Sequence, residues 1–336
     1  MTQDDKSHEG PAPRSVIVSD REHGLPYSKG LMANTIMAAG LSPARAYHVA
    51  HVIEEKLLEG GRESVTNDEL RQIAIDTIRT EAGERYARSY LKWQTVSELD
   101  VPLIILVGGG TGVGKSTIAT QLAARLGIVR IISTDAIREV MKGVFSKDIM
   151  PTLHTSSFNA DEAVREPLPK NEDAVIAGFR QQVSAVAVGI QALIERAVTE
   201  GTDVIIEGAH VVPGFVKPES VDDAVIVHLV VAVEDEDLHR SHFFVRAHET
   251  RARPQGRYLK HFENIRKIQK YIRSLALKNG APIVQNYNMD ATLSAVIEHV
   301  ISRATETAAA RPPRSVRGRS HARPAGLPSR QKEGVL

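Results

Sequence analysis

The chain has 336 residues, of which 42% are hydrophobic, and it carries a formal net charge of +1 at pH 7 and no cysteine. The absence of cysteine excludes disulfides, zinc ribbons, iron–sulfur ligation and cysteine nucleophiles, and the near-zero charge argues against a general attraction to nucleic acid. The length leaves room for two domains, and the lack of an apolar leader or of a membrane-spanning apolar run predicts a cytoplasmic protein without membrane attachment.

The first part of the chain predicts a small helical domain over residues 14–96, preceded by a polar, disordered lead-in over residues 1–13. The apolar run at 16–18 is a strand candidate, and Gly24-Leu25-Pro26 indicates a turn. Four helices should follow, each marked by a cap or an apolar stripe. They are expected over 29–39, from Pro43 after a Ser42 cap, after a Thr66 cap with Glu69 in the capping-box position, and over 84–93.

Residues 109–116 read Gly-Gly-Thr-Gly-Val-Gly-Lys-Ser, which is the phosphate-binding loop pattern G-x-x-x-x-G-K-[ST]. The pattern lies between an apolar run at 103–107 and a segment with helical periodicity, as its mechanism requires. We therefore predict that the loop binds ATP or GTP through Gly109, Gly110, Thr111, Gly112, Val113, Gly114, Lys115, Ser116 and Thr117. Lys115 should reach the β- and γ-phosphates, the Ser116 hydroxyl should hold Mg²⁺, and Thr117 should add a donor to the α-phosphate.

From residue 97 to residue 306 the pattern alternates between strands and helices, which predicts an α/β domain of the P-loop NTPase type. Its parallel sheet should carry helices on both faces, and ligands should bind beyond the carboxyl ends of the strands. Strands are expected over 103–107, 129–132, 204–206, 224–233 and 282–284. Helices are expected over 116–126, 135–142, 172–200, 235–250, 257–278 and 290–305.

Two carboxylates stand directly after predicted strands. Asp135 follows the second strand, where it would orient or deprotonate an acceptor hydroxyl for in-line attack; it is alternatively an ordinary helix cap. Glu207 ends the third strand, near the expected position of Mg²⁺ or the acceptor; it is alternatively a surface carboxylate. Arg138, three residues after Asp135, would clamp an anionic acceptor or remain solvated.

Other polar clusters allow a functional and a structural interpretation. Residues 151–158 contain His154, Ser156 and Ser157, which could grip a polar substrate or form a capping loop. His210 is interpreted as a hydrogen-bonded turn residue. The arginine-rich stretch after residue 239 suggests a lid that closes on the nucleotide, with Arg246, Arg251 and Arg253 as candidates to stabilise the transferring phosphoryl group.

Two further features receive a structural interpretation. His239 and His242 are interpreted as part of a solvated helix face rather than as metal ligands, because no His-Glu zinc pattern accompanies them. Residues 307–336 are basic and poor in apolar side chains, and predict a disordered tail. A solvated terminus is the favoured interpretation of this tail, and binding of nucleic acid or an acidic membrane through it is the alternative.

Several of these stretches together resemble the 2-phosphoglycerate kinase family of P-loop kinases. The matching residues are Gly-Gly-Gly-Thr-Gly-Val-Gly-Lys-Ser-Thr at 108–117, Ser-Thr-Asp-Ala-Ile-Arg-Glu-Val-Met at 133–141, Pro-Thr-Leu-His-Thr-Ser-Ser-Phe at 151–158, Ile-Glu-Gly-Ala-His at 206–210 and Arg-Tyr-Leu-Lys-His-Phe-Glu-Asn-Ile-Arg at 257–266. The N-terminal segment, through Pro26-Tyr27-Ser28-Lys29-Gly30, is similar to an ATP-cone, although Val18-Ser19 stand where many ATP-cones carry basic residues.

The resemblance implies transfer of the γ-phosphoryl group of ATP to the hydroxyl of 2-phosphoglycerate, with Mg²⁺ as the metal and a small phosphorylated acceptor as the partner. The residue patterns above assign catalytic roles to Lys115, Asp135, Arg246 and Arg251, and the resemblance strengthens the assignment of Asp135. The resemblance also favours acceptor binding by Asp135, Arg138, His154, Ser156 and Ser157. The residue patterns place Glu207 at the acceptor or the metal, and Ser116 at the metal. Two alternatives remain: a kinase for another acceptor, such as an inositol phosphate or a nucleoside, and a non-enzymatic nucleotide sensor.

Overall fold

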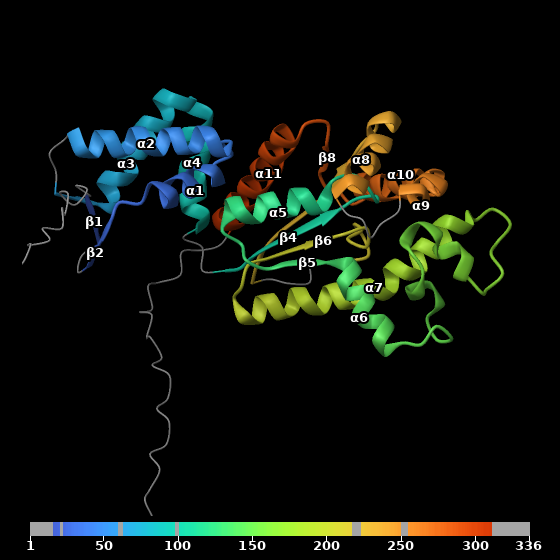
Figure 1. Ribbon diagram of the computed structural model, residues 1–336. Helices are drawn as coiled ribbons and strands as arrows, with labels where there is room; N and C mark the ends of the chain where they lie inside the picture. Colours follow the sequence, from blue (N-terminus) through green and yellow to red (C-terminus); the bar gives the residue numbers. More distant parts are fainter. Residues whose placement is uncertain are drawn as a thin grey trace, which may run out of the picture.

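The computed structural model describes residues 16–20, 23–59, 63–97, 101–216, 223–249 and 255–310. The predicted lead-in over 1–13 lies outside the described residues, as does nearly all of the predicted tail. The described residues form two parts: an N-terminal unit, residues 16–97, and a P-loop unit, residues 101–310 (Figure 1). No helix among the described residues is long and apolar enough to cross a membrane.

The N-terminal unit contains a small sheet as well as helices. The strands β1 (Ile17–Asp20), β2 (His23–Pro26) and β3 (Ser64–Thr66) lie in the order β2-β1-β3. The prediction of a turn at residues 24–26 was wrong, because these residues pair antiparallel with β1. Glycine fits there for another reason: a Cβ on Gly24 would lie 2.4 Å from Ile17 Cγ2.

The four predicted helices of the N-terminal unit are present. They are α1 (Lys29–Ala38), α2 (Pro43–Glu59), α3 (Asn67–Ala82) and α4 (Glu84–Ser97). The capping box at the start of α3 is confirmed, since the Thr66 hydroxyl accepts from the Glu69 N–H at 3.2 Å and the Glu69 carboxylate accepts from the Thr66 N–H at 2.9 Å. The buried faces of these helices form an apolar cluster that is separate from the clusters of the P-loop unit and includes Ile36, Ile53 and Ile78.

The P-loop unit is built on a five-stranded parallel sheet, as predicted. The strands are β4 (Leu103–Gly108), β5 (Ile131–Ser133), β6 (Val204–Glu207), β7 (Val225–Ala232) and β8 (Ile283–Gln285), in the order β5-β6-β4-β7-β8. The central strand β4 pairs in parallel with both β6 and β7. The loop at its carboxyl end is therefore in the middle of the sheet edge where ligands bind.

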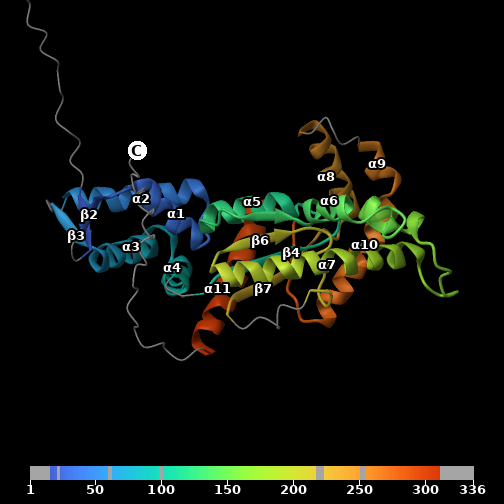
Figure 2. The ribbon, with the colours of Figure 1, turned by 90° about the horizontal axis from the view of Figure 1, so that it is seen from below.

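Helices cover both faces of this sheet (Figures 1 and 2). On one face, α5 (Lys115–Leu126) and α11 (Met289–Ala310) pack against Ile105 and Val107. On the other, α7 (Ala174–Glu200) packs against Ile104 and Leu106. Since successive residues of a strand point to opposite faces, a continuous apolar run such as β4 requires this two-sided cover. On the same face as α7, α10 (Phe262–Lys278) packs against β7 and β8. Beyond the carboxyl ends of the strands lie α6 (Thr134–Val144), the 3₁₀ helices η1 (Pro151–His154) and η2 (Ser157–Ala163), α8 (Glu236–Glu249) and α9 (Gln255–Lys260).

Two helix boundaries differ from the prediction. The helix expected over 257–278 is divided into α9 and α10, and His261 is the residue before α10. The division lets Tyr258 stack on Phe243 while Phe262 packs into the core. In addition, the helix expected over 290–305 extends from Met289 to Ala310 as α11.

The N-terminal unit packs on α5 and α11 of the P-loop unit (Figure 2). Ala38, Trp93 and Val96 from α1 and α4 join the apolar cluster of the P-loop unit rather than that of their own unit. Across the same junction the Ser294 hydroxyl donates to the Gly40 carbonyl at 3.3 Å. The two units therefore share buried apolar surface.

Candidate active site

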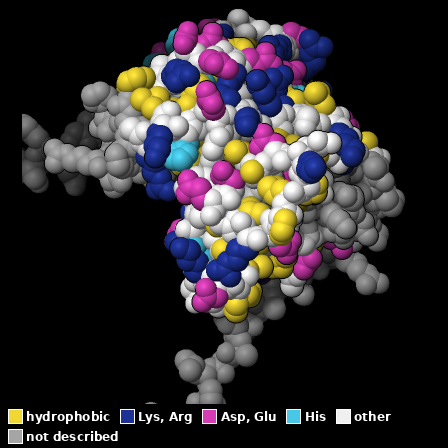
Figure 3. Space-filling model, turned by 90° about the vertical axis from the view of Figure 1, so that its right-hand side faces the viewer, with side chains coloured by type: hydrophobic (Ala, Val, Ile, Leu, Met, Phe, Trp, Pro, Cys, Tyr) yellow, Lys and Arg dark blue, Asp and Glu magenta, His cyan; other side chains and the backbone are white. Residues whose placement is uncertain are grey.

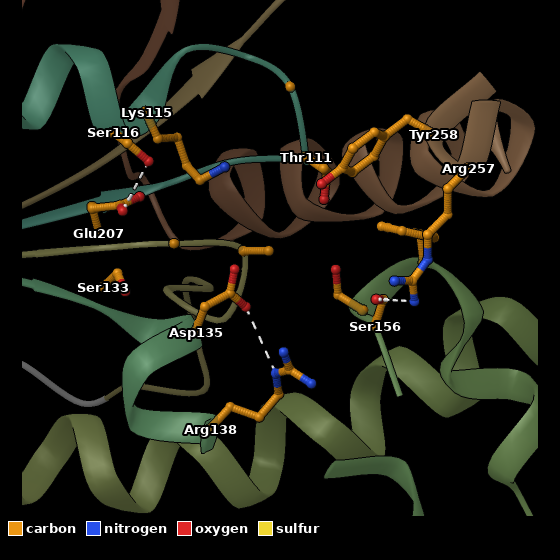
Figure 4. A pocket seen from close by; sticks show the side chains of 15 residues that line it. Thr111, Lys115, Ser116, Ser133, Asp135, Arg138, Ser156, Glu207, Arg257 and Tyr258 are labelled. Carbon is orange, nitrogen blue, oxygen red and sulfur yellow. Dashed lines mark hydrogen bonds and ion pairs between the residues drawn. The ribbon is translucent and has the colours of Figure 1, made fainter. Parts of the chain in front are cut away.

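A cavity of about 350 Å³ opens at the carboxyl ends of β4, β5 and β6 (Figure 4). Figure 3 views the molecule from the side to which these strand ends point in Figure 1, and shows acidic, basic and apolar side chains interspersed on that face. The residues that line the cavity come from the phosphate-binding loop, the start of α6, the 151–158 region, the end of β6 and α9. They are Thr111, Gly112, Lys115, Ser116, Ser133, Asp135, Arg138, Ser156, Ser157, Phe158, Glu207, Gly208, Ala209, Arg257 and Tyr258.

The phosphate-binding loop needs its glycines for two physical reasons. Gly109, Gly112 and Gly114 have φ angles of 139°, 86° and 90°, which other residue types rarely adopt. The space beside them is also occupied, since a Cβ on Gly112 would lie 2.3 Å from the ring of Phe243. The Val113 side chain is fully buried in the core beneath the loop and anchors it.

The side chain of Lys115 and three side chains from later in the sequence contact the carbonyl groups of this loop. Lys115 Nζ donates to the Gly110 carbonyl at 2.6 Å, and Asn286 Nδ2 donates to the Val113 carbonyl at 3.0 Å. Between them, His239 Nε2 lies 2.8 Å from the Thr111 carbonyl and His242 Nδ1 lies 3.0 Å from the Gly112 carbonyl. Fixing successive carbonyls fixes the peptide planes, and so the direction of the N–H dipoles that bind phosphate.

The interpretation of His239 and His242 as a solvated helix face was therefore wrong. His239 is fully buried, and burial lowers its pKa to about 4. A neutral ring fits both contacts, because Nε2–H donates to Thr111 while Nδ1 faces Arg266 Nη1 at 3.4 Å. Sequence spacing alone could not show that α8 lies against the loop.

The two predicted metal ligands lie side by side. Glu207 ends β6 and is 6% exposed, and the Ser116 hydroxyl donates to its Oε1 at 2.9 Å (Figure 4). Hydroxyl and carboxylate oxygens are ligands that Mg²⁺ prefers, and Mg²⁺ in nucleotide sites takes its other ligands from phosphates and water. The pair thus fits a magnesium ion. Glu207 is not the surface carboxylate of the alternative interpretation.

Asp135 faces the cavity from the first turn of α6. The helix cap is Ser133, whose hydroxyl accepts from the Ala136 N–H at 3.2 Å, so the alternative role of Asp135 as the cap was wrong. The Asp135 side chain is 64% exposed, and its Oδ1 lies 3.7 Å from Arg138 Nε. Asp135 and Lys115 lie on opposite sides of the cavity, so an acceptor bound between them can reach the Asp135 carboxylate (Figure 4).

Arg138 connects Asp135 to the 151–158 region. Its side chain is only 13% exposed, and Nη1 donates to the carbonyls of Leu153 and Thr155 at 3.1 and 2.5 Å. The solvated arginine of the alternative interpretation is thereby excluded. Because its Nη1 is engaged with the backbone, Arg138 fixes the 3₁₀ segment as well as lining the cavity.

Sequence reasoning missed Arg257 and Tyr258 of α9. Arg257 Nη2 donates to the Ser156 hydroxyl at 2.8 Å, and its guanidinium lies 5.7 Å from the centre of the Phe158 ring. Figure 4 shows Arg257 and Arg138 on the same side of the cavity, with Ser156 between them. The available signal was the position of Arg257 at the start of the stretch 257–266, where it was read only as part of a motif.

Behind the cavity a buried hydrogen-bond chain supports the start of α6. The Thr134 hydroxyl lies 2.9 Å from His210 Nδ1, and His210 Nε2 lies 2.9 Å from Gln182 Oε1. Gln182 Nε2 continues the chain to the Thr152 carbonyl. His210 is fully buried, and burial lowers its pKa to about 4, with Arg138 lowering it further and Asp135 opposing the shift. The interpretation of His210 as a hydrogen-bonded turn residue therefore fits the structure.

Some predicted site residues do not line the cavity. His154 instead places Nε2 2.9 Å from the Phe145 carbonyl, because it closes η1 against the end of α6. Thr117 is exposed on the first turn of α5. Arg246 lies in α8, but its side chain lies outside the described part of the chain, as do Arg251 and Arg253.

The chain matches two family models, the ATP cone domain over residues 16–98 and the AAA domain over residues 103–217. The 2-phosphoglycerate kinase of Methanothermobacter thermautotrophicus is 39% identical over 282 residues, which span 84% of this chain and 92% of that protein. This chain belongs to the 2-phosphoglycerate kinase family. The members from Pyrococcus horikoshii and Thermococcus kodakarensis are 39% and 40% identical, and the matches cover 87% of this chain and 95% and 99% of theirs.

Membership of the 2-phosphoglycerate kinase family confirms the resemblance drawn from the motifs. Among solved structures, a shikimate kinase from Acinetobacter baumannii overlaps with a TM-score of 0.35 at 18% identity, covering 62% of this chain and 97% of that one.

Proposed function

We propose that this chain transfers the γ-phosphoryl group of ATP to the free hydroxyl of 2-phosphoglycerate, giving ADP and 2,3-bisphosphoglycerate. The observation that carries the proposal is the single cavity in which Lys115 and Ser116 of the phosphate-binding loop face Asp135 from α6 and Arg257 from α9. Membership of the 2-phosphoglycerate kinase family supports the choice of acceptor. ATP as the donor is consistent with action in the cytoplasm.

The nucleotide is held first. Its phosphates lie along the loop and the N-terminus of α5, where N–H dipoles and the helix dipole favour negative charge. The Lys115 ammonium group donates to the Gly110 carbonyl in this structure, and with ATP bound it would donate to the β- and γ-phosphates instead. Mg²⁺, held by Ser116 and Glu207, would neutralise charge on the phosphates.

The acceptor is held on the opposite side of the cavity. 2-Phosphoglycerate carries a phosphate and a carboxylate, and guanidinium groups bind such oxyanions through paired N–H donors. Arg257 and Arg138 supply the positive charge, and the hydroxyls of Ser156 and Ser157 supply further hydrogen-bonding groups. In this orientation the free hydroxyl of the acceptor points toward Asp135.

Transfer then needs alignment more than bond-breaking chemistry from the protein. Asp135 accepts a hydrogen bond from the acceptor hydroxyl and receives its proton as the oxygen forms a bond to the γ-phosphorus. The bond between that phosphorus and the bridging oxygen breaks, and its electron pair leaves with ADP. Lys115 stabilises the charge that spreads over the oxygens of the transferring group.

An acceptor panel tests the proposal. Purified full-length chain is incubated with ATP and Mg²⁺, and ADP release is measured with 2-phosphoglycerate, glycerate, an inositol phosphate and a nucleoside. We expect release with 2-phosphoglycerate and little with glycerate, because glycerate lacks the phosphate that Arg257 binds. Lys115→Ala should release no ADP, while the control variant Lys92→Ala, at an exposed position on α4, should release ADP like the unchanged chain. Faster release with the nucleoside or the inositol phosphate would overturn the acceptor assignment.

A further inference from the structure

A second cavity, of about 460 Å³, lies at the junction of the two units, away from the candidate active site. Residues of the N-terminal unit form one wall, including Ser42, Arg45 and Arg85, and residues of α5 and α11 form the other. The P-loop unit contributes one cation to this cavity, Arg125, which lies in the last turn of α5, whereas Lys115 is the first residue of that helix. At 1.5 Å per residue the two ends of α5 are about 15 Å apart, so the cavities are separate.

Arg125 is a buried cation with incomplete pairing. Its side chain is 3% exposed, and its only ion pair among the described residues joins Nη2 to Asp290 Oδ1 at 3.5 Å. The Asp290 side chain is 74% exposed, so water weakens this attraction. Within the described part of the chain, Nε and Nη1 have no hydrogen-bond partner, including the carbonyls at the end of α5. A guanidinium has five N–H donors, and burying such donors without hydrogen-bond partners costs free energy.

The other charges of the cavity do not resolve this imbalance. Three arginines, at positions 45, 85 and 125, line the cavity together with two carboxylates, Asp290 and Glu298. Glu298 is occupied by Arg85 at 2.8 Å in an exposed pair. Arg45 lies over the Tyr86 ring, 5.5 Å from its centre, in a cation–π contact rather than an ion pair. The cavity therefore carries excess positive charge with guanidinium groups on both walls.

We propose that this junction cavity binds a small molecule through a phosphate group, which Arg125 holds from the P-loop unit and Arg45 and Arg85 hold from the N-terminal unit. Guanidinium groups match phosphate oxygens bidentately, and the Ser42 hydroxyl adds a neutral donor. A volume of about 460 Å³ exceeds what free phosphate needs and falls in the range of small-molecule sites.

The position of the cavity gives such a ligand a route to the nucleotide site. Arg125 is on the helix that begins at the phosphate-binding loop. On the other side, Thr292 of α11 donates to Asn286 Oδ1 at 3.2 Å, and Asn286 donates to the Val113 carbonyl in that loop. Both elements that the ligand would touch are thus connected to the loop. This inference does not depend on the identity of the acceptor.

The test measures phosphate binding without using enzyme activity. Full-length protein is saturated with Mg²⁺, a non-hydrolysable ATP analogue and 2-phosphoglycerate, and its thermal stabilisation is titrated with inorganic phosphate and, separately, with glycerol 3-phosphate. The matched variants are Arg125→Met, which keeps the length and apolar contacts of the side chain, and Arg196→Met, whose side chain is 68% exposed on α7. The difference in stabilisation between these two variants measures phosphate binding at the junction cavity, whether or not the candidate active site is filled.

We expect a saturable rise in melting temperature for the unchanged chain and for Arg196→Met, and an apparent Kd raised about tenfold or more in Arg125→Met. Tighter binding of glycerol 3-phosphate would assign a phosphorylated organic ligand, and equal binding would assign free phosphate. If Arg125→Met fails to fold, Arg45→Gln at the exposed rim should give the same direction of change. Identical titrations of Arg125→Met or Arg45→Gln and the unchanged chain, or no stabilisation of the unchanged chain by either probe, would overturn the proposal.

Discussion

Protonation of buried His210 should make the chain less stable as the pH falls. The pKa of His210 is about 4 in the folded chain because the ring is fully buried, and it is about 6.5 in an unfolded chain. Between these two pH values the unfolded chain binds a proton at this histidine that the folded chain does not bind. The stability of the folded chain therefore falls as the pH falls through this window, and the contribution of neutral His210 is fully present above about pH 6.5. Linkage gives a loss of about 2 kcal/mol between about pH 7.5 and about pH 5.

The structural reason is the hydrogen-bond chain through His210. Gln182 Oε1 can only accept, so His210 Nε2 must carry the hydrogen, and Nδ1 then accepts from the Thr134 hydroxyl. A charged imidazolium would have two donors and would lose the bond from Thr134. The network therefore holds the ring in one neutral tautomer.

The assay is urea unfolding followed by circular dichroism at both pH values, for the unchanged chain and for His210→Gln. Titrating carboxylates contribute to both proteins, so the difference between them isolates His210. We expect the unchanged chain to lose about 2 kcal/mol more than His210→Gln. His48→Gln, in which a side chain 62% exposed on α2 is replaced, controls for the substitution itself. Equal losses in His210→Gln and the unchanged chain would show that His210 does not cause this pH dependence.

Three further changes test the candidate active site. Asp135→Asn should lower kcat about a hundredfold or more with little effect on ATP affinity, because it removes the base that orients the acceptor hydroxyl; a collapse of ATP binding in calorimetry would assign Asp135 to the metal site instead. Arg257→Met should raise KM for the acceptor about tenfold or more while KM for ATP is retained; an unchanged acceptor KM would remove Arg257 from the acceptor site. Gly208→Ala should reduce both stability and activity, because a Cβ there would lie 1.8 Å from Thr134 Oγ1 and φ is 152°; a normal melting curve would contradict this clash.

The sequence was most informative where one local pattern has one structural outcome. The glycine loop followed by Lys115 and Ser116 predicted the phosphate site, and the uninterrupted apolar run of β4 predicted a buried central strand. The position of Glu207 could also be predicted, since it ends an apolar strand and the carboxyl ends of parallel strands share one edge. Its contact with Ser116 follows from that topology.

The sequence was least informative where the outcome depends on contacts between distant segments. Residues 24–26 look like a turn by composition, and only pairing with β1 makes them part of a strand. His239 and His242 have a polar context in the sequence, and nothing in it shows that α8 packs against residues 111 and 112. Arg257 belongs to the same class, because its role depends on the distance from α9 to Ser156.

The domain boundaries stay predictions. A separate apolar cluster in the N-terminal unit favours a division near residue 97. Trp93 and Val96, however, pack into the cluster of the P-loop unit, so the two units are joined by apolar contacts as well as by the chain. Sequence periodicity identified the helix that carries Trp93, but the partner of its apolar face lies beyond the reach of local patterns.

We propose that phosphoryl transfer to 2-phosphoglycerate takes place in the cavity between the phosphate-binding loop and α9. Phosphorus NMR of the full-length chain with ATP, Mg²⁺ and 2-phosphoglycerate tests it most directly, because it observes the product rather than ADP alone. We expect 2,3-bisphosphoglycerate and ADP to form in equal amounts, and neither to form with Lys115→Ala. ATP consumption that yields ADP and inorganic phosphate without a bisphosphorylated product would contradict it.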